Sequence, residues 1–300
     1  MVYLEHLDRL SIKYFLNHSI KPHTTLKVGG KALIYIVPNT FRQLQQSIVI
    51  LKENGVKYKI LGNGSNVLVS DSGYNGAIIS TKELDNIKFA ENSVVATCGV
   101  KLCNLIKQCK NQGLSGLESL CGIPATVGGA IVMNAGAFNS CISDKLISVY
   151  ALYEDKPVII DKQNCSFSYR KSKFLNSKYT ILSATFSLDF KPTLEIENNI
   201  KSFIKMRRER QPVSRSCGSV FKNTSLAPSG LLIEKCGLKG FSLGNASVSN
   251  VHANFINLKD GCTAKEVYEL IKAVKNKVKE KFNITLHEEV EFLGDFKWRF

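Results

Sequence analysis

The segment Leu61–Ser70, which reads LGNGSNVLVS, constrains the fold more than any other part of the sequence. It places two glycines, two asparagines and a serine between two apolar runs, although a two-residue turn is enough to close a hairpin. Glycine adopts positive φ and has no Cβ, so successive backbone N–H groups in such a loop can point at one anion. The segment predicts either a phosphate-holding loop between strands or an irregular turn whose glycines serve geometry alone.

A second glycine-rich block, Cys121–Phe138 (CGIPATVGGAIVMNAGAF), favours the phosphate interpretation. A ligand with a pyrophosphate and a long organic body needs close backbone approach at several points, and two such loops provide it. Neither block is the dinucleotide fingerprint G-x-G-x-x-G, because Val67 stands where the third glycine belongs, and the sequence has no Walker A loop. A different architecture must therefore hold the anion.

The composition narrows the class of protein. The formal charge of +15 favours an anionic partner, such as nucleic acid, an acidic membrane surface or a phosphate-bearing small molecule, or else it reflects lysines on solvated faces. Nine cysteines without a C-x-x-C pair argue against a disulfide framework and against a metal site. No apolar run approaches the ~18 residues of a membrane span, and the first residues lack a signal-peptide core. We therefore expect a complete, cytoplasmic chain of roughly two domains.

Hydrophobic periodicity predicts alternating helices and strands. Helices are predicted from Phe41 to the C-cap signal Asn54-Gly55, from Leu102 to near Gly113, over 194–210, and after a capping box at Thr263–Glu266. Strands are predicted over 56–61, 67–69, 77–79, 94–98, 147–152, 158–160, 179–188, 219–222, 255–258 and 284–293. The polar stretch 82–92 is interpreted as a first domain boundary.

Five ordered blocks together resemble one known family. They are the two glycine-rich blocks, Ser168-Tyr169-Arg170, SCGSVFKN at 216–223 and LHEEVEFLG at 286–294. In this order and at these separations they resemble the UDP-N-acetylenolpyruvoylglucosamine reductase (MurB) family, and the short interval after Arg170 is similar to its compact subtype. The resemblance extends from HTTLKVGG at His23 to Gly294.

The resemblance implies an α+β, three-domain flavoprotein. Subdomains 1–82 and 83–193 would form a vanillyl-alcohol-oxidase/PCMH-type FAD-binding fold, and 194–300 a C-terminal α+β substrate-binding domain. The implied activity is NADPH-dependent reduction of UDP-N-acetylglucosamine-enolpyruvate to UDP-N-acetylmuramate through non-covalent FAD, in peptidoglycan precursor synthesis. The implied partners are the UDP-sugar and NADPH, with no nucleic acid and no membrane, and the chain is expected to be a monomer. All these ligands are anions, which gives the positive charge a use.

The family's motifs also imply a role for individual residues. Arg170 would hold and polarise the substrate carboxylate, Ser219 would deliver a proton, and Glu289 would help to stabilise the enol form. Substrate contacts would come from Tyr169, Arg210 and Asn223. FAD would contact Gly62, Asn63, Gly64, Ser65, Asn66, Gly122, Ile123, Pro124, Thr126, Gly128, Gly129, Asn134 and Gly136.

Strand periodicity adds to this assignment. In a strand, Ser219, Phe221 and Asn223 share one face, and His287, Glu289 and Glu291 share another. Each proposed catalytic residue also has a simpler interpretation: a surface salt bridge for Arg170, a small residue at a strand start for Ser219, and a solvated strand face for Glu289. A charged helix end is the equally simple interpretation of Arg210.

The sequence departs from the family pattern at three positions. His23 and Lys171 stand where the family usually has asparagine, and Glu291 stands where it usually has arginine. None of the three replaces a proposed catalytic group, but they put local hydrogen bonding near the flavin and the charge balance beside Glu289 in doubt.

Three rival functions remain open from the sequence. Gly240–Gly244 matches the nucleophile-elbow pattern G-x-S-x-G, with Asp260 and His287 following in hydrolase order, although the residues after Ser242 form a poor helix. A basic nucleic-acid-binding protein would lose affinity sharply with salt, but it leaves both glycine-rich loops without a purpose. A flavin oxidase of the same fold would consume oxygen without NADPH.

Overall fold

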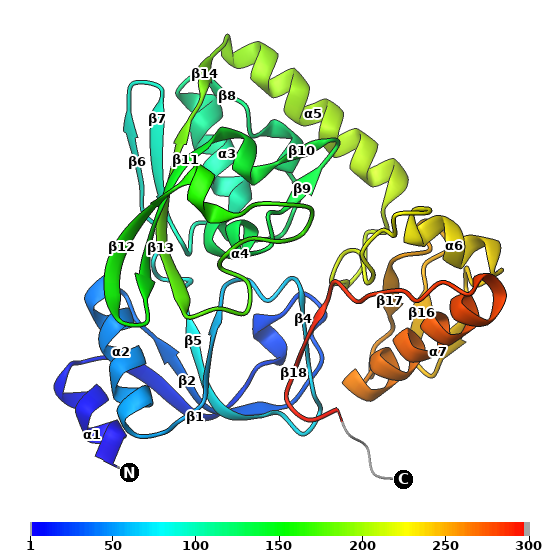
Figure 1. Ribbon diagram of the computed structural model, residues 1–300, viewed down its shortest axis with the longest axis horizontal. Coiled ribbons are helices and arrows are strands. Elements are labelled where there is room, and N and C mark those ends of the chain that lie inside the picture. The colour runs from blue at the N-terminus through cyan, green and yellow to red at the C-terminus, as the bar shows by residue number, and fades with distance from the viewer. Residues whose placement is uncertain (1, 297–300) are drawn as a thin grey trace. The chain divides into compact units, whose positions relative to one another are not determined.

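The computed structural model describes residues 2–296, which fall into two compact units (Figure 1). Unit 1 consists of the described residues up to Leu16 together with Ile34–Asn63 and Gly76–Met206. Unit 2 consists of Asn17–Leu33, Gly64–Asn75 and the described residues from Arg207 onward. Each unit has its own hydrophobic core.

The chain passes between the units within three strands of one sheet. These strands are β1 (Lys13–Ser19), β2 (Lys31–Val37) and β5 (Tyr74–Ser80), in a four-stranded sheet ordered β1-β2-β5-β3. Strand β3 (Tyr58–Leu61) pairs with β5 in parallel, with Leu61 opposite Ser80. The parallel pair places the start of the first glycine-rich loop at the end of a half-buried strand, β3.

A five-stranded antiparallel sheet forms the centre of unit 1 (Figure 1). Its order is β12-β11-β13-β7-β6, and the short helix α4 packs against β13 and β7. The bounds are β6 Ile87–Ala90, β7 Ser93–Thr97, β11 Leu146–Tyr153, β12 Lys156–Asp161, β13 Tyr179–Ser187 and α4 Val127–Val132. Helix α4 lies within the second glycine-rich block, so its packing holds that block against the sheet.

The helices of unit 1 form where the apolar spacing predicts them. Helix α2 (Phe41–Glu53) begins at Thr40, whose side chain accepts a hydrogen bond from the Gln43 N–H, and it buries Leu44, Ile48 and Leu51 completely. Burial of each such side chain stabilises the fold by roughly 1.5–3 kcal/mol. The remaining elements are α1 Val2–Arg9, α3 Leu102–Asn111, α5 Thr193–Arg210, β8 Leu114–Ser115, β9 Gly136–Ala137, β10 Ser140–Cys141 and β14 Asp189–Phe190, with α5 continuing into unit 2 at Arg207.

Unit 2 packs helix α7 (Ala264–Phe282) against a small antiparallel sheet, β15-β16-β17 (Figure 1). The predicted capping box opens α7, because Thr263 and Glu266 exchange side-chain to backbone bonds. Strand β4 (Val67–Val69) pairs in parallel with β18 (Glu291–Leu293). The other bounds are α6 Ser229–Lys235, β15 Ser242–Leu243, β16 Ala246–Val248 and β17 Ile256–Leu258.

Two predicted strands are wrong. The segment 219–222 makes a single isolated bridge, Phe221 to Glu288, and only the last three residues of 284–293 form a strand. Neither segment pairs with a neighbour along its full predicted length within the described residues. The polar stretch 82–92 contains β6, an edge strand whose alternate residues face solvent. The division into 1–82, 83–193 and 194–300 remains a prediction.

Candidate active site

The two glycine-rich blocks meet in unit 1. A Cβ on Gly62 would lie 2.3 Å from Oγ1 of Thr126, so only glycine allows this approach. Next to it, the Asn63 side chain donates from Nδ2 to the carbonyl oxygen of Pro124 at 2.7 Å. Residues predicted to contact one ligand from two separate blocks are therefore neighbours in the structure.

The second half of the first loop lies in unit 2, against the segment that carries Glu289. Gly64 has φ +61°, and a Cβ there would lie 2.4 Å from the backbone oxygen of His23. Asn66 donates from Nδ2 to the carbonyl oxygen of Glu289 at 2.9 Å and accepts from the Glu291 N–H at 2.9 Å. The departures at His23 and Glu291 are thus backbone neighbours of the loop.

The glycines before and within α4 serve different purposes. The Gly128 N–H donates to the Cys98 carbonyl oxygen at 2.9 Å, and a Cβ on Gly128 would lie 2.9 Å from the Cys98 Cβ, so packing against the sheet requires this glycine. Gly129 is exposed, and a Cβ there would meet only Thr126 Oγ1, at an ordinary 3.5 Å. Gly122 is also exposed and has φ +79°. The backbone is therefore accessible to a ligand at Gly122 and Gly129, whereas Gly128 is buried against the sheet.

Arg170 lies in a tight turn of unit 1. Ser168 and Lys171 exchange backbone hydrogen bonds of 3.0 and 3.2 Å, and Arg170 has φ +52°. Its Nη2 donates to the Gly136 carbonyl oxygen at 3.1 Å, and its guanidinium carbon lies 5.2 Å from the centre of the Tyr169 ring. The structure therefore brings together Arg170, Tyr169 and Gly136, which the sequence assigned to one site.

Ser219 and Glu289 lie on adjacent segments of unit 2. The Glu289 N–H donates to the carbonyl oxygen of Val220, the residue after Ser219, at 2.7 Å. The first segment is fixed from its other side by the Asn254 side chain, which accepts from the Phe221 N–H at 2.9 Å and donates to the Phe221 carbonyl at 2.7 Å. Ser219 and Glu289 are thus held by backbone bonds on neighbouring segments.

The predicted common face of Ser219, Phe221 and Asn223 is wrong. Phe221 is buried in the core of unit 2, whereas Asn223 is exposed and accepts from the Ser229 N–H at 3.1 Å. Strict alternation fails because this segment is not a continuous strand. Alternation is clearer around Glu289, where Leu286 and Val290 are buried and His287 is exposed.

Sequence reasoning missed two residues that hold the site in place. Asn254 fixes the segment after Ser219, and Ser172 donates from Oγ to the Val132 carbonyl at 2.7 Å, just after Arg170. Both are buried polar side chains that bond backbone groups distant in sequence. No local pattern marks such residues, because their partners come from other elements.

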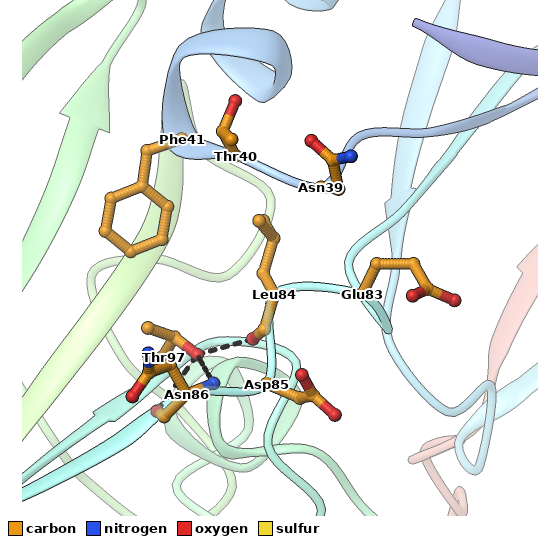
Figure 2. Close-up of a pocket in the computed structure, with 8 residues that line it drawn as sticks. All are labelled: Asn39, Thr40, Phe41, Glu83, Leu84, Asp85, Asn86 and Thr97. Atoms are coloured by element: carbon orange, nitrogen blue, oxygen red, sulfur yellow. Dashed lines mark hydrogen bonds between the residues drawn. The ribbon is translucent and has the colours of Figure 1, made fainter.

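Unit 1 also contains a cavity of about 300 Å³ outside the predicted site (Figure 2). Its lining is Asn39, Thr40, Phe41, Glu83, Leu84, Asp85, Asn86 and Thr97. It has two carboxylate side chains and no lysine or arginine among these lining residues, so it disfavours an anionic ligand. Thr97 Oγ1 bonds the backbone of Leu84 and Asn86, which is a structural role (Figure 2).

Comparisons with known proteins match both parts of the chain. Residues 32–156 match the profile described as "FAD binding domain", and 210–293 match "UDP-N-acetylenolpyruvoylglucosamine reductase, C-terminal domain". A UDP-N-acetylenolpyruvoylglucosamine reductase of Caldicellulosiruptor bescii is 41% identical over 297 residues, covering 97% of this chain and 94% of the relative. One from Clostridium botulinum is 40% identical over 282 residues, covering 93% and 92%.

A solved structure agrees with these sequence matches. The crystal structure of UDP-N-acetylenolpyruvylglucosamine reductase (MurB) from Thermus caldophilus superposes with a TM-score of 0.80 and 32% identity. The match covers 94% of this chain and 99% of that one. Fold and sequence therefore agree over nearly the same span.

Proposed function

The chain belongs to the UDP-N-acetylenolpyruvoylglucosamine reductase family, and on this premise we propose that it makes UDP-N-acetylmuramate, a peptidoglycan precursor. It is an oxidoreductase that reduces the enolpyruvyl group of UDP-N-acetylglucosamine-enolpyruvate, with FAD as cofactor and NADPH as reductant. The observation that carries this conclusion is 41% identity to a named reductase across 97% of the chain.

The residues of the two loops fit FAD. Gly62 and Thr126 bring two backbone segments into contact, and the exposed Gly122 and Gly129 leave room for a diphosphate. The Asn134 side chain is 6% exposed, and its buried Oδ1 accepts no hydrogen bond from the described residues. A buried acceptor without a donor costs about 1–3 kcal/mol, so a ligand N–H or a water is expected to satisfy it.

The chemistry divides between the cofactor and the protein. FAD, which the residues of the two glycine-rich loops would hold, would supply hydride transfer from NADPH to the enolpyruvyl group. This addition places negative charge on the substrate's carboxylated carbon, so the protein must stabilise an enolate and supply a proton. Arg170 is the candidate for the first task, because a guanidinium binds a carboxylate through two parallel hydrogen bonds.

Proton delivery is assigned to Ser219, supported by Glu289. Serine is a weak acid, but a carbanion-like intermediate is a strong base, so the transfer needs only good positioning. The bond from the Glu289 N–H to the Val220 carbonyl holds the two segments side by side within unit 2. Tyr169, Arg210 and Asn223 are assigned to substrate contacts.

We propose that the enzyme is cytoplasmic and acts as a monomer. Among the described residues no helix combines the length and apolarity that crossing a membrane requires. The nucleotide-sugar substrate and NADPH are the partners.

The first test is the visible spectrum of the purified protein, repeated on the supernatant after heat denaturation. Flavin bands released into solution establish non-covalent FAD, and NADPH oxidation that depends on the enolpyruvyl UDP-sugar establishes the reaction. A colourless protein that takes up no added FAD refutes the proposal. NADPH-independent oxygen consumption supports a flavin oxidase instead.

The proton-donor assignment has its own test. We expect Ser219→Ala to retain FAD and its reduction by NADPH, but to lose turnover of the enolpyruvyl substrate by at least about 100-fold, the usual contribution of a positioned proton donor. The exposed Ser225→Ala is the matched control. Unchanged turnover in Ser219→Ala removes Ser219 from the mechanism.

A further inference from the structure

Asn134 links the second glycine-rich block to the turn that carries Arg170. Its side chain is buried, its φ is +43°, and its Nδ2 donates to the carbonyl oxygen of Ser168 at 3.0 Å. Left-handed backbone is rare for residues other than glycine but more accessible to asparagine. The position therefore combines a special backbone conformation with a side-chain donor aimed at a distant segment.

The turn that receives this bond is conformationally demanding. Arg170 is its third residue and has φ +52°, in the left-handed region that a residue with a Cβ seldom adopts. Such a conformation persists only where surrounding contacts determine it. The reciprocal backbone bonds of Ser168 and Lys171 close the turn, but they do not fix where it lies.

Three residues of one short segment fix the position of the turn. Asn134 holds the start of the turn through its bond to Ser168. Just after the end of the turn, Ser172 Oγ donates to the Val132 carbonyl oxygen at 2.7 Å. The backbone carbonyl oxygen of Gly136 accepts a hydrogen bond from the Arg170 guanidinium at 3.1 Å. The start of the turn, its end and its charged tip are thus held by residues 132, 134 and 136.

We propose that Asn134 is a positioning residue for Arg170, setting the direction in which the guanidinium meets the substrate carboxylate. Without the bond to Ser168, the start of the turn is released while its tip still contacts the protein. The guanidinium then loses the fixed orientation that a two-bond carboxylate contact needs. This inference rests on the proposed function, because it takes Arg170 as the carboxylate-binding group.

The test measures substrate binding separately from turnover. The oxidised, FAD-loaded enzyme is titrated with the enolpyruvyl UDP-sugar without NADPH, and the change in flavin absorbance gives the dissociation constant. We expect Asn134→Gly, which keeps the left-handed backbone but removes the donor, to weaken substrate binding about tenfold, the effect of one lost hydrogen bond. Because Asn134 also lies in the proposed FAD site, FAD affinity is measured separately by titrating flavin-free protein, and substrate binding is compared only between FAD-saturated proteins.

Two further variants keep the proposal falsifiable. Asn134→Asp preserves the side-chain shape and removes the donor, so it replaces Asn134→Gly if the latter fails to fold. Asn139→Asp is the matched control, because Asn139 is exposed and also left-handed, with φ +60°. The control should leave substrate binding unchanged.

A double-mutant cycle separates positioning from a general structural role. If Asn134 acts through Arg170, Asn134→Gly should weaken substrate binding no further in an Arg170→Ala background. Equal losses of substrate affinity in both backgrounds, measured on FAD-saturated proteins, overturn the proposal alone. If Arg170→Ala itself leaves substrate binding unchanged, the proposed role of Arg170 fails and this inference fails with it.

Discussion

Replacement of Gly62 by alanine tests the contact between the two glycine-rich blocks. An added Cβ would lie 2.3 Å from Thr126 Oγ1, while the next atoms, Thr126 Cβ and Cγ2, lie at 3.4 and 3.5 Å. The clash is therefore with one hydroxyl oxygen. Gly62 does not have positive φ, so alanine adds no backbone strain of that kind.

The cost follows from what that hydroxyl does. Thr126 caps α4 by accepting from the Gly129 N–H at 3.4 Å, and relief of the clash requires Oγ1 to rotate away or the loop to move. Loss of a helix cap costs about 1 kcal/mol. We therefore expect Gly62→Ala to lower the free energy of unfolding by about 1 kcal/mol and to weaken FAD binding about fivefold or more, since 1.4 kcal/mol is tenfold.

Urea unfolding of the flavin-free protein and FAD titration check both values. In a Thr126→Ala background the clashing oxygen is gone, so Gly62→Ala should cost almost nothing. Gly64→Ala is the matched control, because its clash is with the His23 backbone oxygen and its φ is +61°, and Thr126→Ala should not relieve it. If Gly62→Ala costs the same with and without the Thr126 hydroxyl, the reasoning is refuted.

Two further expectations concern pH and thiols. Hydrogen bonds from the Thr263 backbone hold the pKa of Glu266 below its ordinary value, so its stabilisation is present above pH ~4.5 and is lost as the pH falls through the lower, folded pKa. The melting temperature of Glu266→Gln should thus be below that of the wild type at pH 7, with the difference shrinking in acid; a constant difference contradicts this. Burial raises the pKa of Cys98 and Cys217 to about 12, so iodoacetamide at pH 8 should alkylate the exposed Cys103 first, as mass mapping of the labelled peptides will show. Early labelling of Cys98 would contradict the buried packing.

The sequence predicted the elements whose signals are local. The capping box at Thr263 opens α7, and the glycine signal after Glu53 ends α2 as expected. The segments 219–222 and 284–293 were predicted as strands from composition and alternation, yet a strand also needs a partner along its length. Among residues 2–296, Phe221 has a single bridging partner, Glu288. Pairing of this kind depends on residues far away in the chain, which no local pattern contains.

The sequence motifs indicated where the candidate site lies, but they did not indicate what each residue does there. Sequence alone cannot distinguish Gly128, which packing against Cys98 requires, from Gly129, which leaves an open surface. It also gave no sign of Ser172 or Asn254, whose partners are backbone groups of other elements. The family resemblance supplied candidates for the reacting side chains, whereas the residues that hold those candidates in place emerged only from the contacts.

The pairing of β4 with β18 bears on when the protein becomes competent during synthesis. Val67 emerges early from the ribosome, but its partner Glu291 belongs to the last described part of the chain. Asn66 likewise makes its hydrogen bonds to the backbone of Glu289 and Glu291, which are synthesised later. These contacts join residues that lie more than 200 positions apart in the sequence. Contacts between such distant residues form late and slowly. The loop that contains Asn66 is therefore expected to complete its backbone contacts only after residues 289–291 have been synthesised.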